Sequence, residues 1–279
     1  MQNVVVTGVS TGIGWGITKV LIGRGLRVFG SVRKAQDAER LSKEFGERFI
    51  PLFFDVTDEA AVQAAAQQVR EQLNGETLFG LVNNAGIAVP GPLIHLGTDD
   101  FRHQLEVNLV SVLIVTKAFV PLLGADRSLR GKPGRIINMS SVSGKSASPF
   151  VGAYSASKHG LEGFSEALRR ELMLYGIDVI IIGPGPIATP IWDKAVDISP
   201  YSHTDYVEAA RRAQAYLIRN GKNGLPPEKV GDVVWQALTT RNPRVRYAVL
   251  GRDFLRRFIQ RLLPKRVVDR IVARGLGFK

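Results

Sequence analysis

Short apolar runs rich in β-branched residues alternate with longer stretches of helical periodicity through the first 83 residues. This pattern predicts strands separated by helices. Parallel strands joined in this way need right-handed crossover connections, and they form a sheet with helices on both faces. The predicted elements are Val4–Thr7, Thr11–Gly25, Leu26–Val32, Asp37–Phe45, Phe49–Asp55, Asp58–Leu73 and Leu78–Asn83.

The alternation continues to about residue 182. A loop rich in Pro and Gly, Gly183–Pro190, follows, and a polar, partly helical insertion then runs to about Gly224. Pro226 and Pro227 suit the first turn of a further helix. The other predicted elements are helices Asp100–Leu123 and Ala153–Tyr175 and strands Gly134–Met139, Ile177–Ile182 and Val245–Leu250. Together they predict a single Rossmann-type α/β fold with a doubly wound parallel sheet of about seven strands.

Composition removes several kinds of chemistry. The chain has no cysteine, so we expect no disulfide, no thiolate nucleophile and no sulfur-ligated metal. Its 4 histidines are scattered, and we expect no metal site. The N-terminus runs straight into a strand, and the apolar runs are far shorter than a membrane span. We therefore expect no signal peptide, no spanning helix and a cytoplasmic location.

Charge is concentrated at the C-terminus. The formal net charge is +12, but residues 241–279 carry 12 Lys or Arg and 2 Asp or Glu, which leaves +2 for residues 1–240. Such a nearly neutral body does not favour a nucleic-acid partner. Within the tail, cations lie between apolar residues at helical spacing, which predicts an amphipathic helix interrupted or ended near Pro264. Its apolar stripe is Phe254, Leu255, Phe258, Ile259, Leu262 and Leu263.

Two functions are open for this tail. We favour packing of its apolar stripe on the body of the protein or on a second subunit, with the arginines facing water. The alternative is peripheral contact with an anionic membrane, where each basic residue can contribute about 1 kcal/mol.

Unusual residues cluster just after the predicted strands, at the edge where ligands bind in doubly wound sheets. The first cluster, T-G-x-x-x-G-x-G from Thr7 to Gly14, joins a strand to a helix. Glycine permits positive φ angles and close approach of a pyrophosphate, and a helix N-terminus offers N–H groups to it. Taken alone, the cluster is also compatible with a plain tight turn.

Further motifs follow in order. They are N-N-A-G at Asn83–Gly86, Asn108 in a helix, Ser140-Ser141 after a strand, Y-x-x-x-K from Tyr154 to Lys158, and P-G-x-x-x-T from Pro184 to Thr189. Over about 190 residues these motifs resemble the short-chain dehydrogenase/reductase family. The stretch Tyr154–Tyr175 and the Pro-Ile-Trp after Thr189 look most like its retinol and hydroxysteroid dehydrogenase branch. The resemblance implies an oxidoreductase that moves a hydride between a nicotinamide and a carbonyl or alcohol carbon. It implies a dinucleotide-binding catalytic domain at 1–251, with a substrate loop at about 184–226, followed by the basic helical tail at 252–279.

The chemistry expected of Tyr154 and Lys158 also follows from their spacing. Residues i and i+4 share one face of a helix, so the phenol and the ammonium can share a site. An opposite charge within about 4–6 Å lowers a tyrosine pKa from about 10 toward the working range. Such a tyrosine can give a proton to a developing alkoxide or take one from an alcohol. The alternative is an ordinary aromatic–cation pair on a helix surface.

The resemblance implies roles for the neighbouring residues. The family's serine lies 13 residues before its tyrosine, which favours Ser141 over Ser140 for the hydrogen bond to the substrate oxygen. Asn108 would hold a water that links Lys158 to solvent. The implied catalytic residues are Asn108, Ser141, Tyr154 and Lys158. The implied cofactor-binding residues are Gly8, Ser10, Thr11, Gly12, Ile13, Gly14, Arg33, Asp55, Val56, Asn83, Ala85, Gly86, Tyr154, Lys158, Pro184, Gly185, Ile187 and Thr189.

The end of the second predicted strand favours NADP(H) over NAD(H). NAD-preferring relatives carry an acidic residue there to bind the ribose 2′-hydroxyl. This chain instead has uncharged Val32 and then Arg33, whose planar fork matches a 2′-phosphate. Thr11 departs from the basic residue that many NADP-preferring relatives place in the glycine loop. Asp55 and Val56 resemble the pair that contacts adenine, and a helix cap is the alternative for Asp55.

Apolar residues gather where a substrate would enter, namely in Gly91–Ile94, Pro149–Ala153 and Ile191-Trp192. They predict an apolar small-molecule substrate, such as a steroid, a retinoid or a ketone. A 3-oxoacyl thioester reductase of the same family and a catalytically silent NADP-binding module are the alternatives. The intact Tyr154 and Lys158 speak against the silent module. Relatives commonly pair their long helices across two-fold axes, which implies a homodimer or homotetramer.

Overall fold

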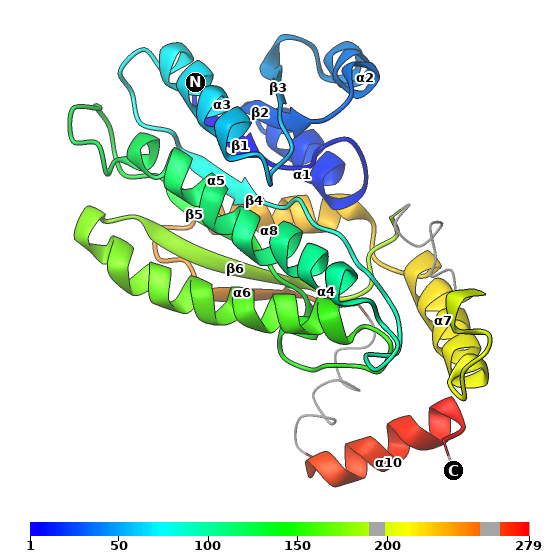
Figure 1. Ribbon diagram of the computed structural model, residues 1–279. Helices are drawn as coiled ribbons and strands as arrows, with labels where there is room; N and C mark the ends of the chain where they lie inside the picture. The colour runs from blue at the N-terminus through cyan, green and yellow to red at the C-terminus, as the bar shows by residue number, and fades with distance from the viewer. Residues whose placement is uncertain (190–198, 252–262, 279) are drawn as a thin grey trace.

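The computed structural model describes residues 1–189, 199–251 and 263–278. Its centre is a seven-stranded sheet with the order β3-β2-β1-β4-β5-β6-β7 and parallel pairing throughout (Figure 1). The strands are β1 (Asn3–Val6), β2 (Arg27–Val32), β3 (Phe49–Phe53), β4 (Gly80–Asn83), β5 (Arg135–Met139), β6 (Asp178–Pro184) and β7 (Arg246–Val249). The predicted doubly wound α/β fold is confirmed. The strand order reverses between β1 and β4, and ligands bind at such a switch point.

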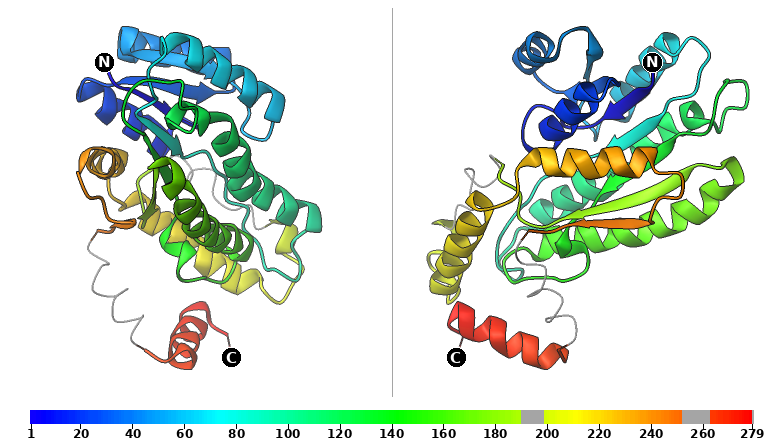
Figure 2. Two further views of the ribbon diagram at one scale, coloured as in Figure 1. Left: turned by 90° about the vertical axis from the view of Figure 1, so that its left-hand side faces the viewer. Right: turned by 180° about the vertical axis from the view of Figure 1, so that it is seen from behind.

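Helices cover both faces of the sheet (Figure 2). The three valines of β1 show what this requires of the sequence. Val4 and Val6 belong to the core formed with α1 (Gly12–Gly23), α2 (Ala35–Phe45) and α8 (Pro227–Thr239). Val5 belongs to the opposite core, which includes α3 (Glu59–Gln72) and α5 (Ser111–Phe119). Successive side chains of a strand point to opposite faces, so a sheet covered on both sides buries all three valines.

Several elements differ in detail from the prediction. The predicted helix 100–123 is divided into α4 (Thr98–Leu105), a π turn η2 (Glu106–Val110), α5 and a 3-10 turn η3 (Pro121–Leu123). The helix 153–175 is α6 (Gly152–Glu171) followed by η5 (Leu172–Tyr175), and α6 lies beside α4. Gly183 and Pro184, which were predicted to be in a loop, still pair with β7 as part of β6. The other short turns are η1 (Gly46–Arg48), η4 (Val142–Gly144) and η7 (Ser199–Tyr201).

Two helices lie apart from the sheet, α7 (Val207–Lys222) and α10 (Lys265–Leu276) (Figure 1). They pack on each other: Leu276 contacts a small core around Phe150 and the alanines of α7, and the Phe278 ring meets the Tyr206 ring edge-on at 6.4 Å. Most of the predicted apolar stripe of the tail, from Phe254 to Leu262, lies outside the described residues. Within the described residues, none of the helices has the length and apolar character to cross a membrane.

Candidate active site

The glycine loop between β1 and α1 meets two other segments at the carboxyl edge of the sheet. Gly8 has φ +68°, and a Cβ there would lie 3.0 Å from the Cα of Ala85. Gly12 has φ +61°, and a Cβ there would lie 3.4 Å from the side chain of Thr189. Positive φ is costly for residues with a Cβ, so both positions need glycine. The two glycines let the loop lie close to Ala85 and Thr189, and the loop leads into the N-terminus of α1, a position whose N–H groups suit a phosphate.

Side chains behind the glycine loop tie it to β2 and β4. Thr7 Oγ1 accepts hydrogen bonds from the N–H groups of Asn84 and Ala85, both at 2.9 Å. Asn84 Nδ2 donates to the carbonyl oxygens of Thr7 at 2.8 Å and of Gly8 at 3.1 Å. The Gly8 N–H donates to Ser31 Oγ at 2.8 Å. Asn84 belongs to the predicted N-N-A-G motif, whereas sequence reasoning missed Ser31, although a polar side chain at the end of a buried strand was an available signal.

Tyr154 and Lys158 lie one turn apart near the start of α6. The Lys158 Nζ lies 5.7 Å from the centroid of the Tyr154 ring and donates to the Met139 carbonyl, at the end of β5, at 2.8 Å. Burial lowers the pKa of Lys158 to about 8. Burial raises the pKa of the Tyr154 hydroxyl, and its hydrogen bond with Ser141 acts in the opposite direction. The expected lowering of the tyrosine pKa is therefore not seen, because desolvation by burial outweighs the hydrogen bond with Ser141.

The two adjacent serines face different partners. Ser141 forms the N-cap of η4, and its Oγ accepts a hydrogen bond from the Ser143 N–H at 3.1 Å. Ser141 also hydrogen-bonds with Tyr154. Ser140 points elsewhere, since its Oγ donates to Glu162 at 2.7 Å. The structure thus brings Ser141, and not Ser140, to the tyrosine.

Asn108 lies in the π turn η2 and is buried. Its Oδ1 accepts from the Ile87 N–H at 2.9 Å, and its Nδ2 donates to the Ile87 carbonyl at 3.0 Å and to Ser157 Oγ at 3.1 Å. A Cβ at Gly86 would lie 3.2 Å from Asn108 Oδ1 and 3.8 Å from Lys158 Nζ. The amide of Asn108 and the ammonium of Lys158 therefore border one small space, and π turns inside helices often mark such sites.

The two residues at the end of β2, Val32 and Arg33, differ in their exposure to solvent. Arg33 is exposed, and its Nη1 lies 3.2 Å from Asp55 Oδ2. Burial alone would raise the pKa of Asp55, but hydrogen bonds from Thr57 and the Arg33 guanidinium hold it below its ordinary value. Val32 is only 3% exposed and packs in the core. Of the two residues named at the end of the second strand, only Arg33 is open to a cofactor, because strand alternation turns the Val32 side chain toward the covering helices.

Arg40 is a candidate cofactor residue that sequence reasoning missed. It lies on α2, and its Nη2 donates to the Ser10 carbonyl of the glycine loop at 2.5 Å. The same guanidinium lies 3.4 Å from Asp37. Arg40 thus supplies the cation beside the glycine loop that Thr11 does not. Its place depends on how α2 packs beside the loop, and no local motif marks it.

The other implied cofactor residues lie along the same edge of the sheet. Asn83 turns into the sheet, where its Nδ2 donates to Asn138 Oδ1 at 2.9 Å, so its side chain supports the strands. The rest lie at the N-terminus of α1 (Thr11, Ile13 and Gly14), after β3 (Val56) and at or after the end of β6 (Pro184, Gly185 and Ile187).

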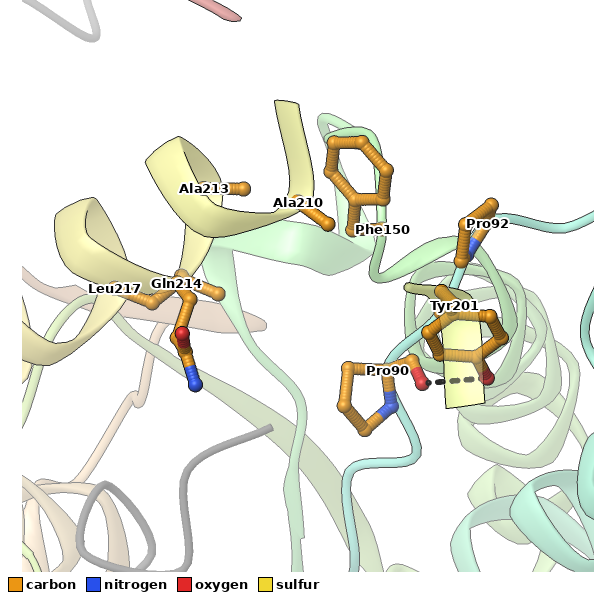
Figure 3. Close-up of a pocket in the computed structure, with 9 residues that line it drawn as sticks. Pro90, Pro92, Phe150, Tyr201, Ala210, Ala213, Gln214 and Leu217 are labelled. Carbon is orange, nitrogen blue, oxygen red and sulfur yellow. Dashed lines mark hydrogen bonds between the residues drawn. The ribbon is translucent and has the colours of Figure 1, made fainter. Parts of the chain in front are cut away.

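A small pocket lies between three parts of the chain: the segment after β4, the segment that precedes α6, and helix α7 (Figure 3). The first two walls are joined, because the Gly91 N–H donates to the Phe150 carbonyl at 2.8 Å. Phe150 comes shortly before Tyr154 in the chain, so the wall and the tyrosine belong to one short segment. The pocket is lined by Pro90, Gly91, Pro92, Phe150, Tyr201, Ala210, Ala213, Gln214 and Leu217.

Only some residues of the predicted substrate entrance line this pocket. Gly91, Pro92 and Phe150 line it. Leu93 and Ile94 do not, and their side chains are exposed to solvent. Residues 191–192 lie outside the described residues. The lining is apolar apart from the amide of Gln214 and the hydroxyl of Tyr201, so it suits an apolar molecule.

Comparison with known proteins gives consistent matches. The family model of the short chain dehydrogenases matches residues 2–198. The chain is 39% identical over 277 residues to the NADPH-dependent 3-dehydrocapnine reductase of Ornithobacterium rhinotracheale, covering 99% of this chain and 98% of that protein. It is 34% identical over 290 residues to 17-beta-hydroxysteroid dehydrogenase type 6 of Homo sapiens, covering 98% and 88%. A solved short-chain dehydrogenase from Streptomyces avermitilis matches with a TM-score of 0.75 at 25% identity, covering 98% and 97%.

Proposed function

Because the chain belongs to the short-chain dehydrogenase family and is therefore an oxidoreductase, we propose that it uses NADP(H) to interconvert a carbonyl and an alcohol on an apolar small molecule. The predicted likeness to the retinol and hydroxysteroid dehydrogenase branch is confirmed. One observation carries the proposal: Tyr154 hydrogen-bonds with Ser141 beside the buried Lys158, at the sheet edge that also holds the glycine loop.

Tyr154 is the proposed acid and base. In reduction its hydroxyl gives a proton to the substrate oxygen, and in oxidation the phenolate takes that proton back. Ser141 donates a hydrogen bond to the same oxygen and holds it at the tyrosine. When bound, the nicotinamide supplies or accepts the hydride.

Two further residues support the charge on the tyrosine. With its pKa lowered to about 8, Lys158 still carries its charge near neutral pH, and in the proposed reaction that charge opposes the rise that burial causes in the pKa of Tyr154. Asn108 borders the same space as Lys158 and would hold a water there that connects the ammonium to solvent. Both roles follow the family resemblance, and the shared space at Gly86 supports them.

NADP(H) is the proposed cofactor for two reasons. Arg33 and Arg40 place two guanidinium groups near the ends of β2 and the glycine loop, where they would bind a 2′-phosphate. The relative from Ornithobacterium rhinotracheale is named as NADPH-dependent. The other implied contacts, from Gly8 to Thr189, would hold the remainder of the dinucleotide.

The pocket lining supports an apolar ketone or alcohol as the substrate. No charged side chain is among the described residues that line it. A 3-oxoacyl thioester reductase shares the same motifs and is the second candidate. A catalytically silent NADP-binding module is the third, and intact Tyr154 and Lys158 oppose it.

By family resemblance, we also propose that the chain forms a homodimer or homotetramer. We propose a cytoplasmic location for it. Peripheral contact with an anionic membrane is proposed for α10, in addition to its packing on α7. Val267 and Ile271 leave 37% and 46% of their surface exposed, one helical turn apart. Exposed Arg266 and Arg270 lie beside them, so one side of α10 combines apolar and cationic groups.

A panel of apolar ketones, short 3-oxoacyl thioesters and matching alcohols, each assayed with NADPH and NADH, tests the proposal. We expect turnover of apolar ketones with a preference for NADPH. Turnover of thioesters alone would favour the second candidate. NADPH binding with no turnover of any compound would favour the silent module.

A further inference from the structure

Glu162 is a buried carboxylate at the centre of a charge cluster beside Ser141. Its side chain is only 6% exposed, and it lies on α6 one turn after Lys158. Arg246 Nε donates to both of its oxygens, at 3.0 and 3.1 Å. Lys145 Nζ lies 3.1 Å from its Oε2. A buried carboxylate lowers stability unless it is paired, and here the pairing is complete on both oxygens.

The cluster holds the Ser141 segment at three points. Before Ser141, the Ser140 hydroxyl donates to Glu162 at 2.7 Å. At Ser141 itself, Arg246 Nη2 donates to the backbone carbonyl at 3.3 Å. After it, Lys145 at the end of η4 pairs with Glu162. Elements that lie far apart in the sequence, η4, α6 and β7, are joined around this serine.

Glycines let the cluster pack closely. A Cβ at Gly144 would lie 2.5 Å from Ser140 Oγ and 3.1 Å from the Cγ of Glu162. A Cβ at Gly183 would lie 3.0 Å from the Cζ of Arg246. Glycine at these two positions therefore avoids a side chain that would push the residues of the cluster apart.

We propose that Glu162 and Arg246 are positioning residues for the reaction, because their ion pair fixes Ser141 where it meets both Tyr154 and the substrate oxygen. Neither residue touches the reacting atoms, and the inference rests on the proposed role of Ser141. A displacement of about 1 Å at a reacting group can slow a reaction on the order of 10²-fold. Arg246 acts through its planar fork, with Nε on Glu162 and Nη2 on Ser141, which a lysine cannot reproduce.

Four single variants test the inference: Glu162→Gln, Arg246→Lys, Ser141→Ala and the control Glu166→Gln. Glu166 lies on the same helix and pairs with Arg170 on the exposed face. The measurements are kcat and KM for a ketone from the panel, the Kd for NADPH, and amide hydrogen exchange of residues 139–146. The Kd shows whether each variant is folded.

We expect Glu162→Gln and Arg246→Lys each to lower kcat about 10- to 100-fold, to leave the Kd for NADPH within roughly twofold, and to speed exchange in residues 139–146. Combining the two substitutions should cost little more than either one, because they break the same ion pair. Glu166→Gln should match wild type. Ser141→Ala should be at least as slow as Glu162→Gln.

Wild-type kcat in Glu162→Gln would overturn the inference, and wild-type kcat in Arg246→Lys would overturn the role of the guanidinium fork. Full activity of Ser141→Ala would instead refute the proposed role of Ser141. If Glu162→Gln does not bind NADPH, the milder variant Ser140→Ala tests the inference in its place, since it removes one hydroxyl only. A several-fold loss of kcat there supports the inference, and an unchanged kcat overturns it.

Discussion

Removing the two cations at the adenosine end should weaken NADPH binding and leave NADH binding almost unchanged. A hydrogen bond to a charged group contributes about 1.5–3 kcal/mol. The side chains of Arg33 and Arg40 are 74% and 46% exposed. Arg33 already pairs with Asp55, and Arg40 already pairs with Asp37 and Glu44. Solvent screening therefore places the contribution of each contact just below that range, at about 1.4 kcal/mol, which corresponds to a tenfold change in Kd.

Isothermal titration at one fixed ionic strength measures the effect. We expect Arg33→Ala and Arg40→Ala each to raise the Kd for NADPH about tenfold, and the double variant to raise it by up to about 100-fold because both contact one phosphate, with the Kd for NADH within roughly twofold. Arg102→Ala is the matched control, because Arg102 is 72% exposed and also pairs with a carboxylate, but on α4. It should change neither Kd.

Two results would refute this reasoning. If the wild-type chain binds NADH as tightly as NADPH, neither arginine discriminates between the cofactors. If the double variant loses affinity for both to the same extent, the arginines support the shape of the site and do not bind the 2′-phosphate.

Three further outcomes are expected. Because burial lowers the pKa of Lys158 to about 8, its ammonium is present below that pH and lost above it. The kcat for reduction should therefore be constant up to about pH 8 and fall at higher pH. A fall that is already complete at pH 7 would contradict this. Ala210→Leu should fill the pocket and raise KM for an apolar ketone about tenfold, with the Kd for NADPH unchanged; an unchanged KM would place the substrate elsewhere. Ile271→Glu should abolish co-sedimentation with anionic vesicles, whereas Val245→Glu, at another exposed apolar position, should not; equal binding by both would leave α10 with its packing role alone.

The sheet could be predicted from sequence because its signals are local. Three consecutive valines from Val4 to Val6 indicate a strand covered on both faces, and that is what the structure contains. The division of helix 100–123 could not be predicted, because the π turn at Asn108 is stabilised by bonds to Ile87 and Ser157, far away in the sequence.

The candidate site was predictable to the extent that its residues lie in contiguous motifs. Successive side chains of a strand point to opposite faces, so if Arg33 is exposed, Val32 should be buried. The sequence pattern therefore already separates the two residues. Arg40, Glu162 and Arg246 carry no motif of their own. Their relevance arises from packing between elements distant in the chain, which a single sequence does not record.

The most direct test of the proposed reaction is deuterium transfer from NADPH labelled at the nicotinamide C4 to an apolar ketone, with wild type and Tyr154→Phe compared. Tyr154→Phe removes one hydroxyl and keeps the ring, so the Kd for NADPH should be unchanged. We predict labelled alcohol from wild type and a rate at least about 10²–10⁴-fold lower from the variant, because the proton donor is lost. Near-normal transfer by Tyr154→Phe, or none by wild type to any ketone of the panel, would contradict the proposed function.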